Sequence, residues 1–354
     1  MTAKKFSLRN SLKGSVSLSS TIKDVALRAG VSTTTVSHVL NKTRFVAKTT
    51  QERVFQAAEE LNYAPSAVAR SLKVKNTKSL GMLVTTTLNP FFAELVNEVE
   101  KCCYREGYNL VLCNTDGELE KTNSYLRMLT QKRVDGILVM CSAYDDSLFS
   151  SLIGQRNLPM VVMDWGPSDD YVDRIQDNSV KGAHLAIQHL IEQGHKQIAY
   201  IGGPLEKLPA KQRLDGFMEA MEQADLAIQD DWVIESDFEF EGGKLGMRQL
   251  LSCHNLPSAV FVANDAMAMG AMSEAQLSGV KIPQQLSIIG YDNCMYSAYF
   301  SPPLTTINQP KERLAELAIS TMIERIENPR QEGKMIMLEP NLVVRSSVAA
   351  VSKE

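Results

Sequence analysis

Apolar residues near the start of the chain recur at helical spacing. Four of them stand at i, i+3, i+4 and i+7, namely Ile22, Val25, Ala26 and Ala29. This spacing places all four on one face of a helix. Gly30 breaks the pattern, and the chain is therefore expected to turn directly after this short amphipathic helix.

A second helix is predicted immediately after the turn. Ser32 is placed to cap its N-terminus, and its inward face carries Val36, Val39 and Leu40. The opposite face carries short polar side chains: Thr33, Thr34, Ser37 and His38. Two short helices joined by a tight turn form a helix-turn-helix, whose second helix enters the major groove of DNA. Short polar side chains on that helix can read the edges of the bases.

A third helix is expected next, because Thr49 and Glu52 have the spacing of a capping box. Its buried stripe consists of Val54, Ala57, Ala58 and Leu61. Three short helices can close a small core, so residues 21–64 are predicted to form a helix-turn-helix domain. An ordinary three-helix bundle is the alternative. It does not explain why the tight turn and the polar outward face coincide.

Residues 65–78 are predicted to form a hinge helix and linker. Pro65 suits the first position of a helix, and the helical run that follows is only about two turns long, which is marginal in water. This segment should order only when a copy of itself and the DNA support it. Leu72, near its end, can wedge between base steps from the minor groove. A plain linker that happens to contain a leucine is the alternative.

From Ser79 the pattern changes to short apolar runs that alternate with amphipathic helices. Strands are predicted at residues 80–84, 109–113, 136–140, 160–163, 197–201, 259–262 and 287–290. Helices lie between them, and a late helix at residues 311–327 should cross back to the first run. This alternation predicts an α/β fold of doubly wound parallel sheets. The interruption between the two runs indicates two lobes within residues 79–354.

Charge is divided unevenly along the chain. Residues 1–80 contain fourteen lysines and arginines and four acidic residues, a net charge of +10. The whole chain carries −4, which leaves −14 for residues 81–354. A basic head on an acidic body fits nucleic-acid contact that is confined to one end. A merely solvated charged surface would not explain this segregation.

Composition adds expectations about the termini and the compartment. Residues 1–20 are basic and contain no acidic residue, so they are expected to form a disordered arm that attracts phosphate. No apolar run approaches the roughly 20 residues of a membrane span. The six cysteines show no Cys-x-x-Cys spacing and are expected to behave as small hydrophobes. A reducing cytoplasm is the expected compartment.

Two motifs carry a resemblance to a known family. Residues 31–39 read Val-Ser-Thr-Thr-Thr-Val-Ser-His-Val, and residues 65–73 read Pro-Ser-Ala-Val-Ala-Arg-Ser-Leu-Lys. On these motifs the chain resembles the lactose-repressor family of bacterial transcription regulators, over nearly its whole length from residue 21. It is most similar to the ribose and purine repressors, with the ribose repressors nearest. The resemblance implies a two-lobed domain akin to the periplasmic sugar-binding proteins.

The resemblance also implies which residues contact DNA. Thr34, Ser37 and His38 would face the bases, Arg44 would approach the groove, and Leu72 would be the minor-groove wedge. The complete predicted DNA-binding set is Thr33, Thr34, Ser37, His38, Arg44, Leu72 and Lys73.

Polar and aromatic residues fall where the cleft between the lobes should lie. Ligands of such folds bind at the carboxyl ends of strands. The predicted effector-binding residues there are Asn89, Phe91, Phe92, Asp164, Trp165, Arg213, Phe238, Asn264, Asp292 and Gln309. Such groups can hydrogen-bond the hydroxyls of a sugar while aromatic faces stack on its ring.

The resemblance relates these positions to the ribose-binding pattern of the periplasmic proteins. Trp165 departs from that pattern, because it stands where the periplasmic ribose proteins carry an arginine. Each residue alone also has a plainer explanation. Asn89 before Pro90, for example, makes a good helix cap.

These observations predict a DNA-binding repressor that ribose, or a close derivative, releases from its operator. Double-stranded DNA and a second copy of the chain are the expected partners, and the lack of leucine heptads at the C-terminus favours a dimer. A purine-responsive repressor is the alternative. The resemblance gives the purine regulators a basic residue and a hydroxyl in the loop after Gly-Pro-Leu-Glu, where this chain has Lys207 and Pro209.

Two other classes compete with a ligand-responsive repressor. An α/β enzyme is disfavoured, because the chain lacks G-x-G-x-x-G, P-loop, G-x-S-x-G and H-E-x-x-H motifs. An architectural DNA-binding protein would show weak sequence preference and no response to a small molecule. The sequence therefore predicts no catalytic residue, no metal ligand and no cofactor.

Overall fold

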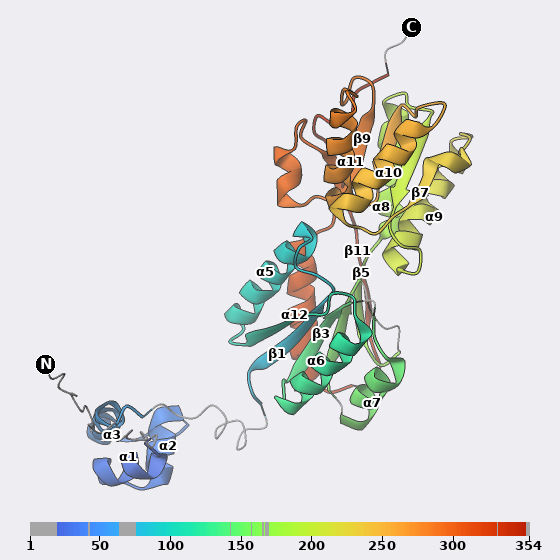
Figure 1. The fold of residues 1–354 in the computed structure, drawn as a ribbon. Helices are drawn as coiled ribbons and strands as arrows, with labels where there is room; N and C mark the ends of the chain where they lie inside the picture. Colours follow the sequence, from blue (N-terminus) through green and yellow to red (C-terminus); the bar gives the residue numbers. More distant parts are fainter. Residues whose placement is uncertain are drawn as a thin grey trace, which may run out of the picture. The chain divides into compact units, whose positions relative to one another are not determined.

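The computed structural model of the chain describes residues 20–41, 43–63, 76–141, 143–156, 158–164, 166, 170–330 and 332–351. The chain divides into two compact units, Met1–Thr77 and Lys78–Glu354 (Figure 1). Most of the predicted basic arm, and the hinge positions Leu72 and Lys73, lie outside the described residues, as does Trp165.

The first unit contains the predicted helix-turn-helix. Helix α1 spans Ile22–Ala29, α2 spans Thr33–Asn41 and α3 spans Lys48–Glu60. Their shared core consists of Val25, Ala26, Ala29, Val36, Val39, Val54, Ala57 and Ala58. Gly30 has a φ of +65°, a left-handed conformation that suits glycine at a helix end. Ser32 Oγ accepts a hydrogen bond from the Thr35 backbone N at 3.1 Å, so the predicted cap of α2 is confirmed.

The predicted capping box of the third helix is wrong. Helix α3 begins at Lys48, its N-cap residue is Ala47, and no side chain caps it. Thr49 already lies inside the first turn, where its hydroxyl cannot serve as the N-cap. A capping box occurs instead at α1, where Asp24 Oδ2 accepts from the Thr21 backbone N at 2.7 Å.

The second unit contains two sheets, as predicted. In the first sheet every described pair is parallel, and the strand order is β11-β5-β4-β3-β1-β2. These strands are β1 (Ser79–Val84), β2 (Asn109–Asn114), β3 (Gly136–Met140), β4 (Met160–Met163), β5 (Asp173–Asp177) and β11 (Met335–Leu338). The second sheet has the order β12-β10-β9-β8-β6-β7, with an antiparallel β12. Its strands are β6 (Ile198–Gly202), β7 (Val233–Glu235), β8 (Ala259–Val262), β9 (Ser287–Asp292), β10 (Thr305–Asn308) and β12 (Asn341–Val343).

All seven predicted strands are present, but β5, β7, β10, β11 and β12 were not predicted. Strand β5 reads Asp-Arg-Ile-Gln-Asp and has one apolar residue, so no apolar pattern marks it. It is a strand because β4 and β11 pair with it on either side.

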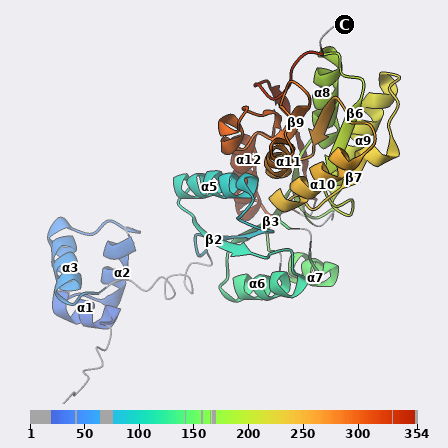
Figure 2. The ribbon, with the colours of Figure 1, turned by 45° about the horizontal axis from the view of Figure 1, so that its top comes forward.

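Helices cover both faces of each sheet. In the first lobe they are α5 (Pro90–Arg105), α6 (Leu119–Gln131), α7 (Asp146–Arg156) and α12 (Lys311–Glu327). In the second lobe they are α8 (Ser179–Glu192), α9 (Leu208–Gln223), α10 (Phe240–Ser252) and α11 (Asp265–Leu277), with short 3-10 turns η1 (Asp230–Trp232) and η2 (Met295–Tyr299). Helices α5 and α6 lie on opposite sides of the first sheet, and α10 runs beside α11 (Figure 2).

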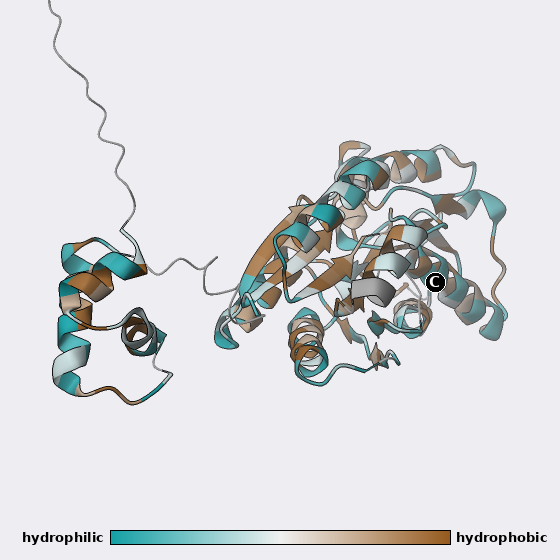
Figure 3. Ribbon diagram, turned by 90° about the horizontal axis from the view of Figure 1, so that it is seen from below, coloured by the Kyte–Doolittle hydropathy of each residue, from teal (hydrophilic) through white to brown (hydrophobic). Residues whose placement is uncertain are grey.

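Alternating side chains of β1 serve the two faces of the first sheet. Leu80 and Met82 belong to the same buried cluster as Leu95 of α5, whereas Leu83 packs in a second cluster with Leu126 of α6. Each such fully buried leucine contributes roughly 1.5–3 kcal/mol of hydrophobic stabilisation. Colouring by hydropathy shows the strands as mostly apolar and the helices as two-sided (Figure 3).

The chain passes between the lobes at the carboxyl ends of β5, β10 and β11. The predicted return of the late helix is confirmed, because α12 packs against α5, β4 and β5 of the first lobe. Its Arg325 Nη1 lies 2.9 Å from Asp173 Oδ2 of β5, in a buried ion pair. None of the described helices is long and apolar enough to span a bilayer. All six cysteines are free thiols, and five of them are buried.

Candidate functional site

Arg213 of α9 is the centre of a buried polar cluster in the second unit. Its side chain is buried, and Nη1 donates to the Ala263 carbonyl at 2.6 Å. Nη1 also lies 3.7 Å from Asp292 Oδ1. The guanidinium carbon stands 3.8 Å from the centre of the Tyr291 ring and 5.8 Å from that of Phe238. Tyr291 and Phe238 thus provide aromatic faces for the cation.

Asp292 and Gln309 form the second part of the cluster. Asp292 ends β9, and Gln309 follows β10, so the parallel pairing of these strands brings the two side chains together. Gln309 Nε2 donates to Asp292 Oδ1 at 3.3 Å. Asp292 has a φ of +106°, a conformation rare for a non-glycine residue and typical of functional sites. Lys311 Nζ donates to the Asp292 carbonyl at 2.8 Å.

Two asparagines converge on the backbone of Phe238. Asn264 Nδ2 donates to the Phe238 carbonyl at 2.8 Å, and Asn89 Nδ2 lies 3.5 Å from the same oxygen. Both residues also cap helices, because Asn264 Oδ1 accepts from Met267 N and Asn89 Oδ1 accepts from Phe91 N. Both asparagines therefore cap helices and also lie beside Phe238 at the candidate site. Asn89 belongs to the first lobe and Phe238 to the second.

Asp164 joins this cluster from the end of β4. Its Oδ1 accepts from the Asp177 backbone N at 2.7 Å. Its Oδ2 is buried and has no hydrogen-bond partner among the described residues. Arg213 Nε and Gln309 Oε1 are likewise buried without described partners. Unpaired buried polar atoms are costly, so these groups mark a place where a ligand can complete the hydrogen bonding.

Burial raises the pKa of the carboxyl groups in the cluster. The pKa of Asp164 is raised by burial, although the Asp177 backbone N–H and Arg213 oppose the shift. Burial also raises the pKa of Asp292 well above its usual range, against the opposing effect of Arg213. For Arg213, burial favours the neutral form, but Tyr291 and the carboxylates outweigh it and raise the pKa. The site therefore holds a guanidinium among carboxyls that compete for protons.

The predicted aromatic residues Phe91, Phe92 and Phe238 are all buried in the main core, and Phe91 and Phe238 also lie near cationic side chains of the cluster. Phe238 lies against Arg213 at the site, with Lys207 Nζ 5.8 Å from its ring centre. Phe91 and Phe92 are buried in the main core, and their ring centroids lie 5.6 Å apart in an edge-to-face arrangement.

Sequence reasoning missed Asp177 and Tyr291. The Tyr291 hydroxyl donates to Asp177 Oδ2, which joins β9 of the second lobe to β5 of the first. Asp177 was missed because the strand that it ends was not predicted. Tyr291 lies between the predicted strand at residues 287–290 and Asp292, and it was given no role. Position at the carboxyl end of a strand was the available signal, and it required β5 to be recognised first.

In the helix-turn-helix domain, here called the headpiece, the predicted base-facing residues share the outer side of α2. Thr33 and Thr34 are exposed, while Ser37 and His38 are half-buried. His38 Nδ1 is 2.8 Å from Thr43 Oγ1, and this contact ties the helix to the loop that carries Arg44. Arg44 is exposed, and the neighbouring Phe45 is 95% exposed.

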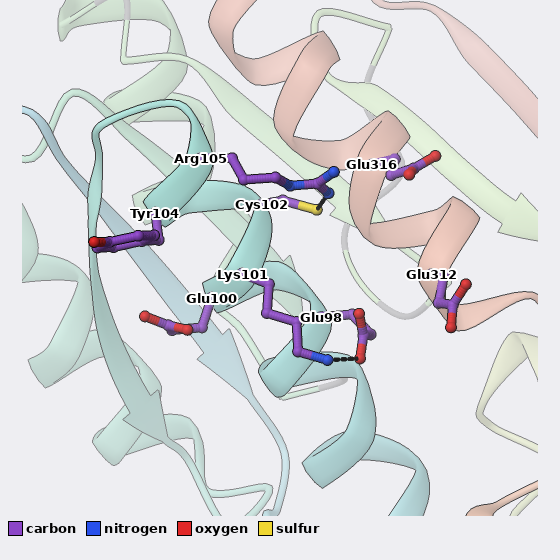
Figure 4. Close-up of a pocket in the computed structure, with 8 residues that line it drawn as sticks. All are labelled: Glu98, Glu100, Lys101, Cys102, Tyr104, Arg105, Glu312 and Glu316. Carbon is purple, nitrogen blue, oxygen red and sulfur yellow. Dashed lines mark hydrogen bonds and ion pairs between the residues drawn. The ribbon is translucent and has the colours of Figure 1, made fainter.

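A separate surface pocket of about 470 Å³ lies between α5 and α12. Figure 4 shows its charged lining, in which Arg105 reaches Cys102 and Lys101 pairs with Glu98. None of the predicted effector-binding residues lines it. Among the described residues, no group of His, Cys, Asp or Glu side chains could hold a metal ion.

Two family models match the chain. One, described as "Bacterial regulatory proteins, lacI family", matches residues 21–66. The other, described as "Periplasmic binding protein-like domain", matches residues 187–348. The first covers the helix-turn-helix, and the second covers most of the second lobe together with α12.

Curated relatives match over nearly the whole chain. The HTH-type transcriptional repressor PurR of Aliivibrio salmonicida is 52% identical over 93% of this chain and 98% of its own. The same repressor of Proteus mirabilis is 53% identical over 93% of this chain and 97% of its own. These names do not support the expectation that the ribose repressors are nearest.

Solved structures agree on the fold. The lac repressor dimer bound to operator and the anti-inducer ONPF superimposes with a TM-score of 0.83, at 28% identity over 94% of this chain and 99% of that chain. A lacI-family regulator from Enterococcus faecium with bound ribose has a TM-score of 0.71, at 29% identity over 77% of this chain and all of that chain.

We predict that Arg213→Gln destabilises the protein by roughly 3–5 kcal/mol at pH 8, because it leaves buried carboxylates uncompensated. Without the guanidinium the pKa values of Asp164 and Asp292 rise further. The cost of ionising them in the folded state then grows with pH, so the loss should be smaller at pH 5. Urea unfolding at both pH values measures it. Arg313→Gln, which breaks an exposed pair with Glu316, should cost at most about 1 kcal/mol at either pH. An equal loss for both variants would contradict the role given to Arg213.

Proposed function

This chain belongs to the lacI family of bacterial regulatory proteins, and from that premise we propose that a small molecule bound at Arg213 controls its affinity for operator DNA. It is a DNA-binding transcriptional repressor of that family. Its curated relatives are transcriptional repressors, not enzymes.

The proposed DNA interface is the outer face of α2 with the loop that follows. The first threonines of α2 are exposed, and the His38–Thr43 contact holds the loop so that Arg44 projects beside the helix. Thr34, Ser37 and His38 would read base edges, and Arg44 would bind phosphate or the groove. Leu72 and Lys73 complete the proposed set from the hinge.

The first candidate effector is a pentose such as ribose. The observation that carries this proposal is the set of unpartnered buried atoms at Asp164, Arg213 and Gln309, which supplies both acceptors and donors. Each hydroxyl of a sugar both donates and accepts, so one ring can satisfy all of them. The ribose-bound regulator of the same fold supports the choice. Pro209 offers no hydroxyl to a purine base.

A purine is the second candidate, and the relatives favour it over ribose. Repressors named PurR share more than half of their residues with this chain over 93% of its length. Lys207 is half-buried and close to the Phe238 ring, so a basic residue does face the site where a purine would stack. Both candidates are uncharged rings with several hydrogen-bonding edges.

The proposed switch uses the passages between the lobes. An effector that contacts Asp164 from the first lobe and Arg213 from the second would favour one arrangement of the lobes over another. Paired hinge segments, with Leu72 inserted into DNA, would be compatible with only one arrangement. Operator affinity can change only by the difference in effector affinity between the two states.

A second copy of the chain is the proposed partner on an apolar surface of the second lobe. Tyr299 is 81%, Leu277 77% and Met295 57% exposed. Gln276 of α11 donates to the Ser301 carbonyl, so the η2 segment lies next to the end of α11. The repressor of similar fold on its operator is a dimer. Exposed apolar side chains on neighbouring segments are typical of protein–protein contacts.

For the effector, we predict that saturating ribose weakens binding to a selected operator by about 5–150-fold, the range of typical allosteric coupling. Mobility-shift titrations with ribose, other pentoses, hypoxanthine and guanine measure it. Asp292→Asn should abolish the response and leave effector-free operator binding unchanged. Tighter operator binding with hypoxanthine or guanine would replace ribose by the purine alternative. No response to any of these compounds would remove the proposed function.

For the DNA interface, we predict that Thr34→Ala weakens operator binding by about 0.5–1.5 kcal/mol, the net contribution of a typical single hydrogen bond. Binding to an unrelated duplex should stay the same, because a base-facing threonine contributes nothing to non-specific attraction. Gln56→Ala, an exposed change on α3, is the matched control and should leave both affinities unchanged. Equal weakening on both duplexes would contradict base readout by Thr34.

For the dimer, we predict that Tyr299→Asp converts the protein to a monomer, because a carboxylate would be buried without a partner in the interface. Sedimentation velocity over a range of concentrations measures the change. Leu119→Asp, an exposed apolar residue at the start of α6, should leave the dimer intact. A wild-type chain that sediments as a monomer at micromolar concentration would refute this surface.

A further inference from the structure

Asp177 stands where the chain leaves the first lobe. It ends β5, and Asn178 then caps α8 of the second lobe through the Lys181 backbone N at 3.2 Å. The Asn178 backbone N donates to the Leu338 carbonyl at the end of β11, so two passages between the lobes are joined at this point. The Asp177 side chain is buried. Asp177 therefore lies where the two lobes are connected.

Tyr291 connects Asp177 to the centre of the polar cluster. Its hydroxyl donates to Asp177 Oδ2, and its ring lies 3.8 Å from the guanidinium carbon of Arg213. Gly182 of α8 makes room for it, because a Cβ there would overlap the tyrosine hydroxyl. Asp177, Tyr291 and Arg213 therefore form a continuous series of contacts from the first lobe into the second.

Asp177 also presents an unused acceptor. Its Oδ1 is buried and has no hydrogen-bond partner among the described residues, and the same is true of Asp164 Oδ2. The Asp177 backbone N donates to Asp164 Oδ1 at 2.7 Å, so the two residues are neighbours. Unpaired acceptors on two neighbouring residues can be matched by a ligand that carries two O–H or N–H donors.

Resting on the proposed function, we propose that Asp177 is a further effector-binding residue and that the site takes an uncharged, donor-rich ring and rejects a phosphorylated one. Of the described residues at the cluster, Asp164, Asp177 and Asp292 face the one guanidinium of Arg213. Lys311 adds a positive charge near Asp292, but it also pairs with Glu94 at 3.4 Å, and Lys207 Nζ lies 5.8 Å from the centre of the Phe238 ring. A phosphate would add negative charge beside three buried carboxyl groups that share one buried guanidinium.

The protonation of Asp177 gives a readout that needs no effector. Burial and the neighbouring Asp164 raise the pKa of Asp177 to about 7, while Tyr291, Arg213 and Ser179 oppose that shift. The unfolded carboxyl titrates near its ordinary value, so between about pH 4 and 7 the folded state binds the extra proton. Stability from this group is therefore present at low pH and is lost as pH rises toward 7.

The first test follows the full-length, effector-free protein by thermal unfolding at pH 5 and pH 8. Asp177→Asn removes the titrating group but keeps an oxygen for Tyr291. Its melting temperature relative to wild type should rise by roughly 2–4 °C between pH 5 and pH 8. Tyr291→Phe keeps the ring on Arg213 and should raise the pKa of Asp177 further, which moves the transition to higher pH. A pH-independent difference for Asp177→Asn would overturn the assignment of Asp177.

The second test is calorimetric titration with ribose and with hypoxanthine. Asp177→Asn should weaken the binding of whichever ring compound binds the wild type by about tenfold or more. This is the loss expected for a hydrogen bond to a charged group. Ser179→Ala removes only the 3.4 Å contact to the same carboxylate and should stay within about twofold. The phosphorylated counterpart, ribose 5-phosphate or inosine 5′-monophosphate, should bind at least about 100-fold more weakly. Equal or tighter binding of the phosphorylated compound would overturn the proposed ligand class.

The two tests separate this inference from the proposed function. If neither ring binds, the proposed effector fails, while the effector-free unfolding test still decides whether Asp177 titrates with the cluster. If a ring compound binds the wild type and Asp177→Asn with equal affinity, the proposed function stands. The proposal that Asp177 binds the effector is then contradicted.

Discussion

Arg213 is a permanent charge with 2% of its surface exposed, and much of the second unit is arranged around the need to compensate it. A buried guanidinium is tolerated only when carboxylates and carbonyls surround it closely. Here the Ala263 carbonyl and Asp292 provide partners, while Asp164 and Asp177 add negative charge at longer range. Burial raises the pKa values of these carboxyl groups, and neighbouring carboxylates add to the shift at Asp177 and Asp292. The cluster is left with unsatisfied capacity for hydrogen bonds, which is what a ligand site requires.

The same cluster lies where the chain passes between the lobes. Asp177 precedes the crossing into α8, and Gln309 precedes the crossing into α12. In the proposed switch, residues that contact the ligand therefore also stand at the passages between the lobes. This placement would join binding to conformation without a long relay of intermediate residues, because the proposed binding groups lie on the connecting segments themselves.

The headpiece follows a different physical rule. Its small core holds three short helices together. The polar outer side chains of α2 do not belong to that core. The turn at Gly30 and the cap at Ser32 position α2 within the headpiece. Recognition there depends on which short side chains project from one helix, whereas recognition in the second unit depends on charge compensation among residues that are far apart in sequence.

The sequence by itself determined the helix-turn-helix and the alternation of strands and helices, because helical spacing and apolar runs are local properties. It also placed Asp164, Asn264 and Asp292 just after predicted apolar strands, whereas Arg213 lies within α9 and Gln309 follows β10, a strand that was not predicted. It did not find β5, whose single apolar residue gives no pattern, or Asp177, which ends that strand. The assignment of Phe91 to the ligand stays a prediction, since this residue belongs to the buried core and also lies near Lys311.

Only the tertiary structure decided which polar groups share one buried space. Strand β5 exists because β4 and β11 flank it, and the hydrogen bond between Asp177 and Tyr291 joins residues separated by 114 positions. The pKa shifts and the unpartnered oxygens arise from burial among distant neighbours. Periodicity along a chain carries information about faces and local turns, but the electrostatic balance of a cluster depends on distances that only packing sets.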